Sequence, residues 1–166
     1  MFVPDTADGS PDSNAARLVV RRSALSDAPQ LAWAIHAARG WLGDEIEGAP
    51  PGMRRYHADL RLRVSETPSL VTFRKAAYVD IGPVRADASG WEAEINWRAA
   101  SLAPLFPVFS GTIAARPGEL SISGWYLPPG GTLGRLADRA LLHIAAEGTA
   151  RWFLTELDRV AAIGVA

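Results

Sequence analysis

The sequence predicts an α+β protein in which a single antiparallel sheet curves around a long C-terminal helix. Several segments between residues 56 and 127 alternate apolar and polar side chains, as strands with one solvent-exposed face do. After Pro128 and Pro129 the apolar period changes from two to the 3.6 of a helix. The 166 residues are 48% hydrophobic and 21% charged, which is enough apolar material for one buried core.

Charge and cysteine content exclude several classes of protein. The 17 basic and 18 acidic residues give a net charge of -1, so no electrostatic attraction to nucleic acid or acidic membranes is expected. The absence of cysteine excludes disulfide scaffolds, thiol nucleophiles and Cys-ligated metals. His36, His57 and His143 lack the HxH or HExxH spacing of a zinc site. We expect no metal and no cofactor, with His36 and His57 at the surface.

The first residues differ in composition from the rest of the chain. Residues 1–14 carry three aspartates among Gly, Ser and Pro, without the basic and apolar regions of a signal peptide. We expect residues 1–15 to form a disordered leader and residues 16–166 to form one ligand-binding domain. No apolar run approaches the ~18 residues that span a membrane. The expectation is a bacterial, cytoplasmic protein that is a monomer or a homodimer.

The N-terminal part of the domain is predicted to contain one strand and two helices. Residues 16–25 have the pattern of a strand. Ser26 or Asp27 can cap the helix that follows, and Pro29 is tolerated in a first helical turn. Glycines then divide residues 26–47 into a helix and a shorter second helix.

Five further strands are predicted, separated by turns that contain Gly, Pro, Asp or Ser. Alternation is clearest in residues 56–64, where one face is apolar and the other carries His, Asp and Arg. The remaining predicted strands are residues 70–81, 91–99, 105–115 and 120–127.

The last predicted element is a helix over residues 132–162. Its apolar stripe is expected to pack on the sheet, with Ile144 at its centre. The predicted stripe of the first half contains Leu133, Leu136, Ala137, Ala140, Leu141, Ile144 and Gly148. Toward the end it continues with Phe153, Leu157 and Val160.

Three segments resemble a known family. They are LFPVFSG at residues 105–111, GWYLPPGG at 124–131 and LGRLADRALLH at 133–143. With the element order, they make the chain similar to the SRPBCC (START/Bet v 1-like) superfamily and its bacterial polyketide cyclase/dehydrase-like members. The resemblance implies a helix-grip fold with a hydrophobic cavity between sheet and helix. Such a cavity would take lipids, polyketides or other apolar small molecules, and some members are cyclases or dehydratases.

Two glycines have inward parity on neighbouring predicted strands. Gly111 follows Phe109 on one strand, and Gly124 precedes Tyr126 on the next. Glycine in a strand marks a bend or the close approach of another group. The two glycines could allow close packing of the helix on the sheet, or they could leave room for a ligand.

Lys75 shares the inward parity of apolar neighbours on its strand. An inward amine needs an anion or water, or it loses its charge. A β-bulge, or a side chain that bends back to solvent, is the favoured alternative. Tyr56, Trp97 and Tyr126 place aromatic rings with polar tips on inner faces, where core packing also explains them.

His143, Glu147 and Arg151 are spaced four residues apart beside the helical stripe. They could supply polar groups to a cavity, with His143 as proton carrier. An ordinary surface ladder of i,i+4 pairs is the favoured interpretation. The residues expected to line the cavity are Tyr56, Lys75, Trp97, Phe109, Gly111, Gly124, Tyr126, Ala140, His143 and Ile144.

Three functional hypotheses follow. The first, and favoured, is a binding module for an apolar small molecule. The second is a cyclase or dehydratase that uses Lys75, Tyr126 or His143 for proton transfer. The third is a close-packed interaction domain without a ligand, since six tryptophans could fill the interior. No catalytic residue is assigned.

Overall fold

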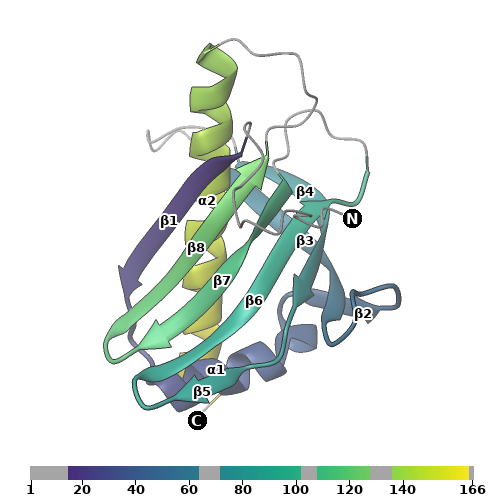
Figure 1. The fold of residues 1–166 in the computed structure, drawn as a ribbon. Coiled ribbons are helices and arrows are strands. Elements are labelled where there is room, and N and C mark those ends of the chain that lie inside the picture. The colour runs from purple at the N-terminus through teal and green to yellow at the C-terminus, as the bar shows by residue number, and fades with distance from the viewer. Residues whose placement is uncertain (1–14, 64–71, 102–107, 128–135, 165–166) are drawn as a thin grey trace, which may run out of the picture.

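In the computed structural model one long helix crosses an antiparallel sheet (Figure 1). The structure describes residues 15–63, 72–101, 108–127 and 136–164. The predicted leader and the start of the predicted last helix lie outside these residues. The strands are β1 (Ala16–Ser23), β2 (Gly43–Ile46), β3 (Arg54–Arg63), β4 (Thr72–Ile81), β5 (Arg85–Asp87), β6 (Gly90–Ala99), β7 (Val108–Arg116) and β8 (Glu119–Leu127). The helices are α1 (Ala28–His36), the single 3₁₀ turn η1 (Ala38–Gly40) and α2 (Leu136–Ile163).

The sheet has the strand order β1-β8-β7-β6-β4-β3-β2, with β5 paired to β6. Every pairing is antiparallel. The α2 helix lies behind β8 and β7 in Figure 1, and α1 lies at one end of the sheet. These features confirm the predicted α+β fold class. Within the described residues they also confirm the strands predicted at β3, β4, β6, β7 and β8, whereas the short strand β5 was not predicted.

Alternation divides the sheet into an inner face, turned toward α2, and an outer face. On β6, Trp91, Ala93, Ile95 and Trp97 are buried, while the charged residues between them are exposed. The α1 helix is fixed to this core by two indole groups. Trp91 Nε1 donates to Ala28 O at 2.7 Å, and Trp41 Nε1 donates to Ala34 O at 2.8 Å. Apolar burial and these hydrogen bonds together set the position of α1.

The predicted start of α1 is confirmed, but the predicted second helix is wrong. Asp27 caps α1 in a capping box with Gln30, and Pro29 lies in the first turn. After the single turn η1 the chain becomes β2, which pairs with β3. Gly43 explains the change, because its φ is 145° and a Cβ there would collide with the backbone of His57.

One buried carboxylate joins α2 to the first connection of the chain. Asp158 is 1% exposed and accepts hydrogen bonds from Leu25 N at 3.0 Å and Ser26 N at 3.0 Å. Arg22 Nη2 lies 3.3 Å from the same carboxylate. A buried charge needs such partners, so the connection between β1 and α1 and the last turns of α2 are held together.

The predicted stripe of α2 is only partly correct. Ala140 is exposed and Ile144 is 42% exposed, so neither packs on the sheet. The buried residues of the first half include Leu142, Ala145 and Ala146. Residues 140–146 are apolar at every position except His143, so their pattern alone cannot select a face.

In the second half of α2 the predicted face is confirmed. Phe153 and Leu157 are buried, and Val160 packs partly buried against the core. Gly148 is also buried. Predictions for Leu133 and for the side chains of Leu136, Ala137 and Leu141 lie outside what the structure describes. Across the described residues no helix is both long and apolar enough to span a bilayer.

The buried face of α2 seen in the structure leads to a prediction about stability. Leu154→Ala removes a fully buried side chain and should lower the free energy of unfolding by about 2–5 kcal/mol. Ile144→Ala, on the exposed side, should change it by less than about 1 kcal/mol. Urea denaturation midpoints measure both. Equal losses for the two variants would contradict the orientation of α2.

Candidate functional site

Aromatic residues from four strands form one row across the inner face. Strand pairing places Tyr56 beside Val79, Val79 beside Trp97, Trp97 beside Phe109, and Phe109 beside Tyr126. All five side chains are buried, with exposed fractions of 4% or less. We call these five residues the inner row. Four of them were predicted as lining residues, and the structure brings these four together.

Two polar atoms of the inner row are buried without a hydrogen-bond partner among the described residues. They are Tyr56 Oη and Trp97 Nε1. A buried polar atom without a partner costs about 1–3 kcal/mol. Burial raises the pKa of Tyr56, Arg54 opposes this, and Glu45 adds to it. Tyr56 is therefore a neutral phenol at physiological pH, and both atoms can donate a hydrogen bond.

The middle of the inner row is closely packed. The rings of Trp97 and Phe109 stack with centroids 4.0 Å apart at an interplanar angle of 19°. A Cβ on Gly124 would lie 2.5 Å from Gly111 Cα and 2.9 Å from Phe109 Cζ. The two glycines therefore serve close packing, and the Phe109 ring occupies the space that a ligand was predicted to share.

One end of the inner row is joined to α2 by a hydrogen bond. Tyr126 Oη lies 3.0 Å from His143 Nδ1. Burial raises the pKa of Tyr126, so its hydroxyl stays protonated and shares this hydrogen bond with the imidazole nitrogen. The His143 side chain is 50% exposed, and its Nε2 lies 4.0 Å from Glu147 Oε2. Arg151 Nε donates to Glu147 Oε1 at 3.0 Å. The predicted series of contacts along α2, from His143 to Glu147 to Arg151, is therefore present, and Tyr126 on β8 extends it to the sheet.

Three other predicted lining residues lie away from the inner row. Lys75 is half-buried and pairs with the buried Leu60, four residues or about 13 Å along β3 from Tyr56. The β3–β4 register runs without interruption, so Lys75 has the inner parity and no bulge turns it outward. Ala140 and Ile144 are exposed on α2, so their placement inside the cavity is corrected.

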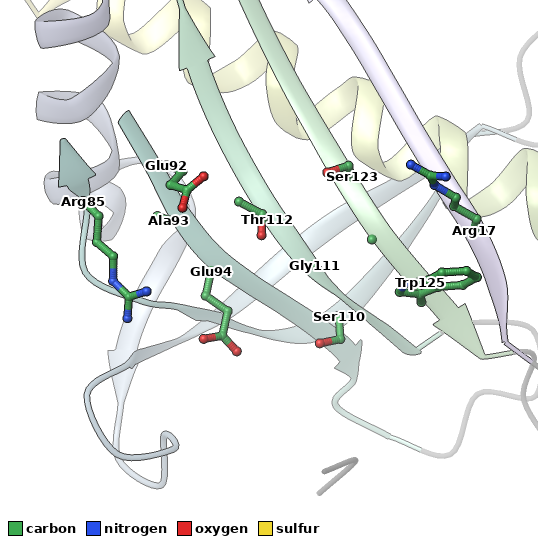
Figure 2. A pocket seen from close by; sticks show the side chains of 11 residues that line it. Arg17, Arg85, Glu92, Ala93, Glu94, Ser110, Gly111, Thr112, Ser123 and Trp125 are labelled. Atoms are coloured by element: carbon green, nitrogen blue, oxygen red, sulfur yellow. The ribbon is translucent and has the colours of Figure 1, made fainter. Parts of the chain in front are cut away.

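Sequence analysis missed two hollows on the outer face. Figure 2 shows the first, on the side of the sheet turned away from α2, with a volume of about 540 Å³. Its lining side chains include Glu92 and Glu94, which are exposed. His36 and His57 are also exposed, as predicted.

The second hollow has a volume of about 310 Å³ and lies under the connection between β2 and β3. We call it the outer cleft. It is lined by Gly48, Ala49, Pro50, Pro51, Arg55, Tyr78, Asp80, Asn96, Trp97, Arg98, Val108, Phe109 and Ser110. The sequence feature that could have revealed this cleft is a set of charged and polar residues at outward-facing positions of adjacent strands.

The close packing of the glycines makes a second prediction. Gly124→Ala should lower the free energy of unfolding by about 1–3 kcal/mol, because the new methyl group meets backbone atoms that cannot move easily. Gly40→Ala is the control, since a Cβ there meets nothing within 4 Å, and it should be neutral or slightly stabilising. Thermal unfolding of both variants measures the difference. A neutral Gly124→Ala would contradict the packing described above.

Comparison with known proteins supports the fold. No protein-family model and no curated protein sequence matches this chain. Among solved structures, the Zhui aromatase/cyclase from Streptomyces sp. R1128 is similar with a TM-score of 0.59 and 10% identity. The similarity covers 92% of this chain and 96% of that protein.

Two di-domain aromatase/cyclases are also similar. BexL from the BE-7585A biosynthetic pathway has a TM-score of 0.58 and 13% identity over 89% of this chain and 50% of its own. StfQ from the steffimycin pathway has a TM-score of 0.50 and 12% identity over 91% of this chain and 52% of its own. This chain thus spans about half the length of each. At these identities the likeness shows the fold alone, which is the helix-grip architecture.

Proposed function

We propose that this protein binds an apolar ring compound bearing oxygen atoms, of polyketide type, between the sheet and α2. The observation that carries the proposal is the pair of unpartnered donors, Tyr56 Oη and Trp97 Nε1, in an otherwise apolar inner row. An indole N–H can only donate, and the neutral phenol of Tyr56 donates as well. A ligand that supplies carbonyl or hydroxyl oxygens would give both atoms an acceptor.

The surroundings of the two donors favour a flat ligand. The rings of Trp97 and Phe109 stack on each other, and a flat ligand ring that enters beside them would gain the same kind of aromatic contact. Ligand sites commonly combine an apolar lining with a few polar groups that fix orientation. The similar folds described as aromatase/cyclases support the same ligand class.

Matched neutral ligands test the proposal. Displacement of the fluorescent probe N-phenyl-1-naphthylamine gives affinities for 1-tetralone, which has a carbonyl oxygen, and for tetralin, which lacks it. The parent protein should prefer 1-tetralone roughly two- to tenfold, as one net hydrogen bond predicts. Tyr56→Phe and Trp97→Phe keep a ring and remove a donor, so each should reduce this preference.

Tyr78→Phe is the matched control, because Tyr78 lies on the outer face and loses the same hydroxyl. It should keep the preference of the parent. If neither ligand displaces the probe, or the probe itself does not bind, the inner row is a packed core and the proposal is wrong.

A second candidate function is proton transfer to or from the bound ligand. The hydrogen bond between Tyr126 Oη and His143 Nδ1 favours it, because it joins a buried phenol to a half-exposed imidazole. Tyr126 could give its proton to a ligand oxygen while His143 returns a proton from solvent. Such a step would serve cyclisation or dehydration of a carbonyl compound.

Hydrogen exchange of a model ketone tests this candidate. In D₂O the protein should accelerate exchange of the protons beside the carbonyl of 1-tetralone, followed by NMR. Tyr126→Phe should lower the rate at least about a hundredfold, the lower end of the range for one acid–base group. Tyr78→Phe should keep it. Parent protein that binds 1-tetralone without faster exchange would be a binding module alone.

A further inference from the structure

The outer cleft carries a second set of polar side chains on the face opposite the inner row, although Trp97 and Phe109 border both. Asn96 and Trp97 are consecutive residues of β6, so their side chains lie on opposite faces of the sheet. Register places Arg55 beside Asp80, Asp80 beside Asn96, and Asn96 beside Ser110. Four adjacent strands therefore supply one polar row to the outer cleft.

The charges of the outer cleft do not cancel. Arg55 and Asp80 form a bidentate pair with distances of 2.7 and 2.8 Å, and Asp80 is 7% exposed. Hydrogen bonding to Asp80 raises the pKa of Arg55, and the opposite charges of this salt bridge offset each other. Arg98 adds a positive charge, and no carboxylate of the described residues lies within 4.0 Å of it. The charged residues that line the cleft, Arg55, Asp80 and Arg98, therefore sum to +1 and favour an anion, while Glu94 lies beside Asn96 outside this lining.

Arg98 is exposed, and its guanidinium contacts the ring of Tyr78. The guanidinium carbon of Arg98 lies 5.3 Å from the centroid of the Tyr78 ring, and that of Arg55 lies 5.6 Å from it. Both distances are within the range of cation–π attraction. A guanidinium held in this way presents its N–H groups in a fixed fork, which matches the two oxygens of a carboxylate.

Two further features of the outer cleft, a buried acceptor atom and an apolar surface, restrict which ligand it can bind. Asn96 Oδ1 is buried without a partner among the described residues, while its Nδ2 faces Glu94 Oε1 at 3.5 Å and Met53 Sδ at 3.7 Å. The free group of this amide is thus an acceptor, which a ligand N–H or O–H would satisfy. Ala49, Pro50 and Val108 provide apolar surface beside it.

We infer that the outer cleft binds a small organic acid, with its carboxylate on Arg98 and a hydrogen-bond donor directed to Asn96. An apolar body between these two groups would lie against Pro50 and Val108. The cleft volume of about 310 Å³ is at the lower end of the range for small-molecule sites. A compact acid, rather than an extended ligand, fits this space.

Calorimetric titration with 4-hydroxybenzoate tests the inference, because this probe has a carboxylate, a ring and a hydroxyl donor. Arg98→Gln should weaken binding by about tenfold or more, the effect of losing a hydrogen bond to a charged group. Arg61→Gln is the matched control, since Arg61 lies on the outer face of β3 outside the cleft and is exposed. It should bind like the parent.

Three ligand comparisons separate the contributions of the hydrogen-bond donor, the negative charge and the apolar body of the ligand to binding. Benzoate, which lacks the donor, should bind roughly two- to tenfold more weakly, and Asn96→Leu should remove that difference. 4-Hydroxybenzamide, which lacks the charge, and inorganic phosphate, which lacks the apolar body, should both bind more weakly than 4-hydroxybenzoate. Equal binding of either one would overturn the assignment of an organic acid.

Two results would contradict the proposed binding of an organic acid in the outer cleft. If Arg98→Gln binds 4-hydroxybenzoate as the parent does, the outer cleft is not the site. If the parent shows no saturable binding, the inference is wrong. Displacement of N-phenyl-1-naphthylamine from Arg98→Gln should match the parent, because Arg98 lies on the opposite face from the inner row, and this confirms that the variant is folded.

Discussion

The position of α2 depends on the buried carboxylate of Asp158. This group accepts the N–H groups of Leu25 and Ser26 and lies beside Arg22, so one side chain connects the last helix to the first strand and to the start of α1. Apolar burial holds a helix against a sheet but allows it to slide or rotate, since it has no direction. Directed hydrogen bonds to a buried charge remove that freedom. With α2 fixed in this way, His143 faces Tyr126 and the inner row is closed on one side.

The strand register then gives the sheet two chemically different faces. Between neighbouring residues of β6 the environment changes from the polar outer cleft at Asn96 to the aromatic inner row at Trp97. A shift of one residue in any pairing would exchange these surroundings, burying charge and exposing aromatic rings. The same hydrogen-bond ladder therefore places the inner row on one face and the polar row of the outer cleft on the other, with Trp97 and Phe109 bordering both.

Period-two alternation predicted the six longer strands and four members of the inner row, because burial of one face produces alternating apolar residues in the sequence. It did not predict the short strands β2 and β5. The helical face of α2 was not predictable around Ile144, where neighbouring apolar residues fit several stripes. The contact between Tyr126 and His143 joins distant parts of the chain, so no local pattern contains it. The outer cleft was missed for a related reason. Parity identifies Asp80 and Asn96 as outward, but only the folded chain shows that the segment with Pro50 covers them.

The paired glycines affect the register in which β7 and β8 pair during folding. Gly111 lies directly opposite Gly124, with the Phe109 ring over both. A hairpin displaced by two residues would keep every side chain on its correct face, so the hydrophobic pattern alone would accept it. That displacement would place a larger residue opposite each glycine, where backbone and ring leave no space for a Cβ. The two glycines therefore favour the observed register of β7 and β8 over the register displaced by two residues.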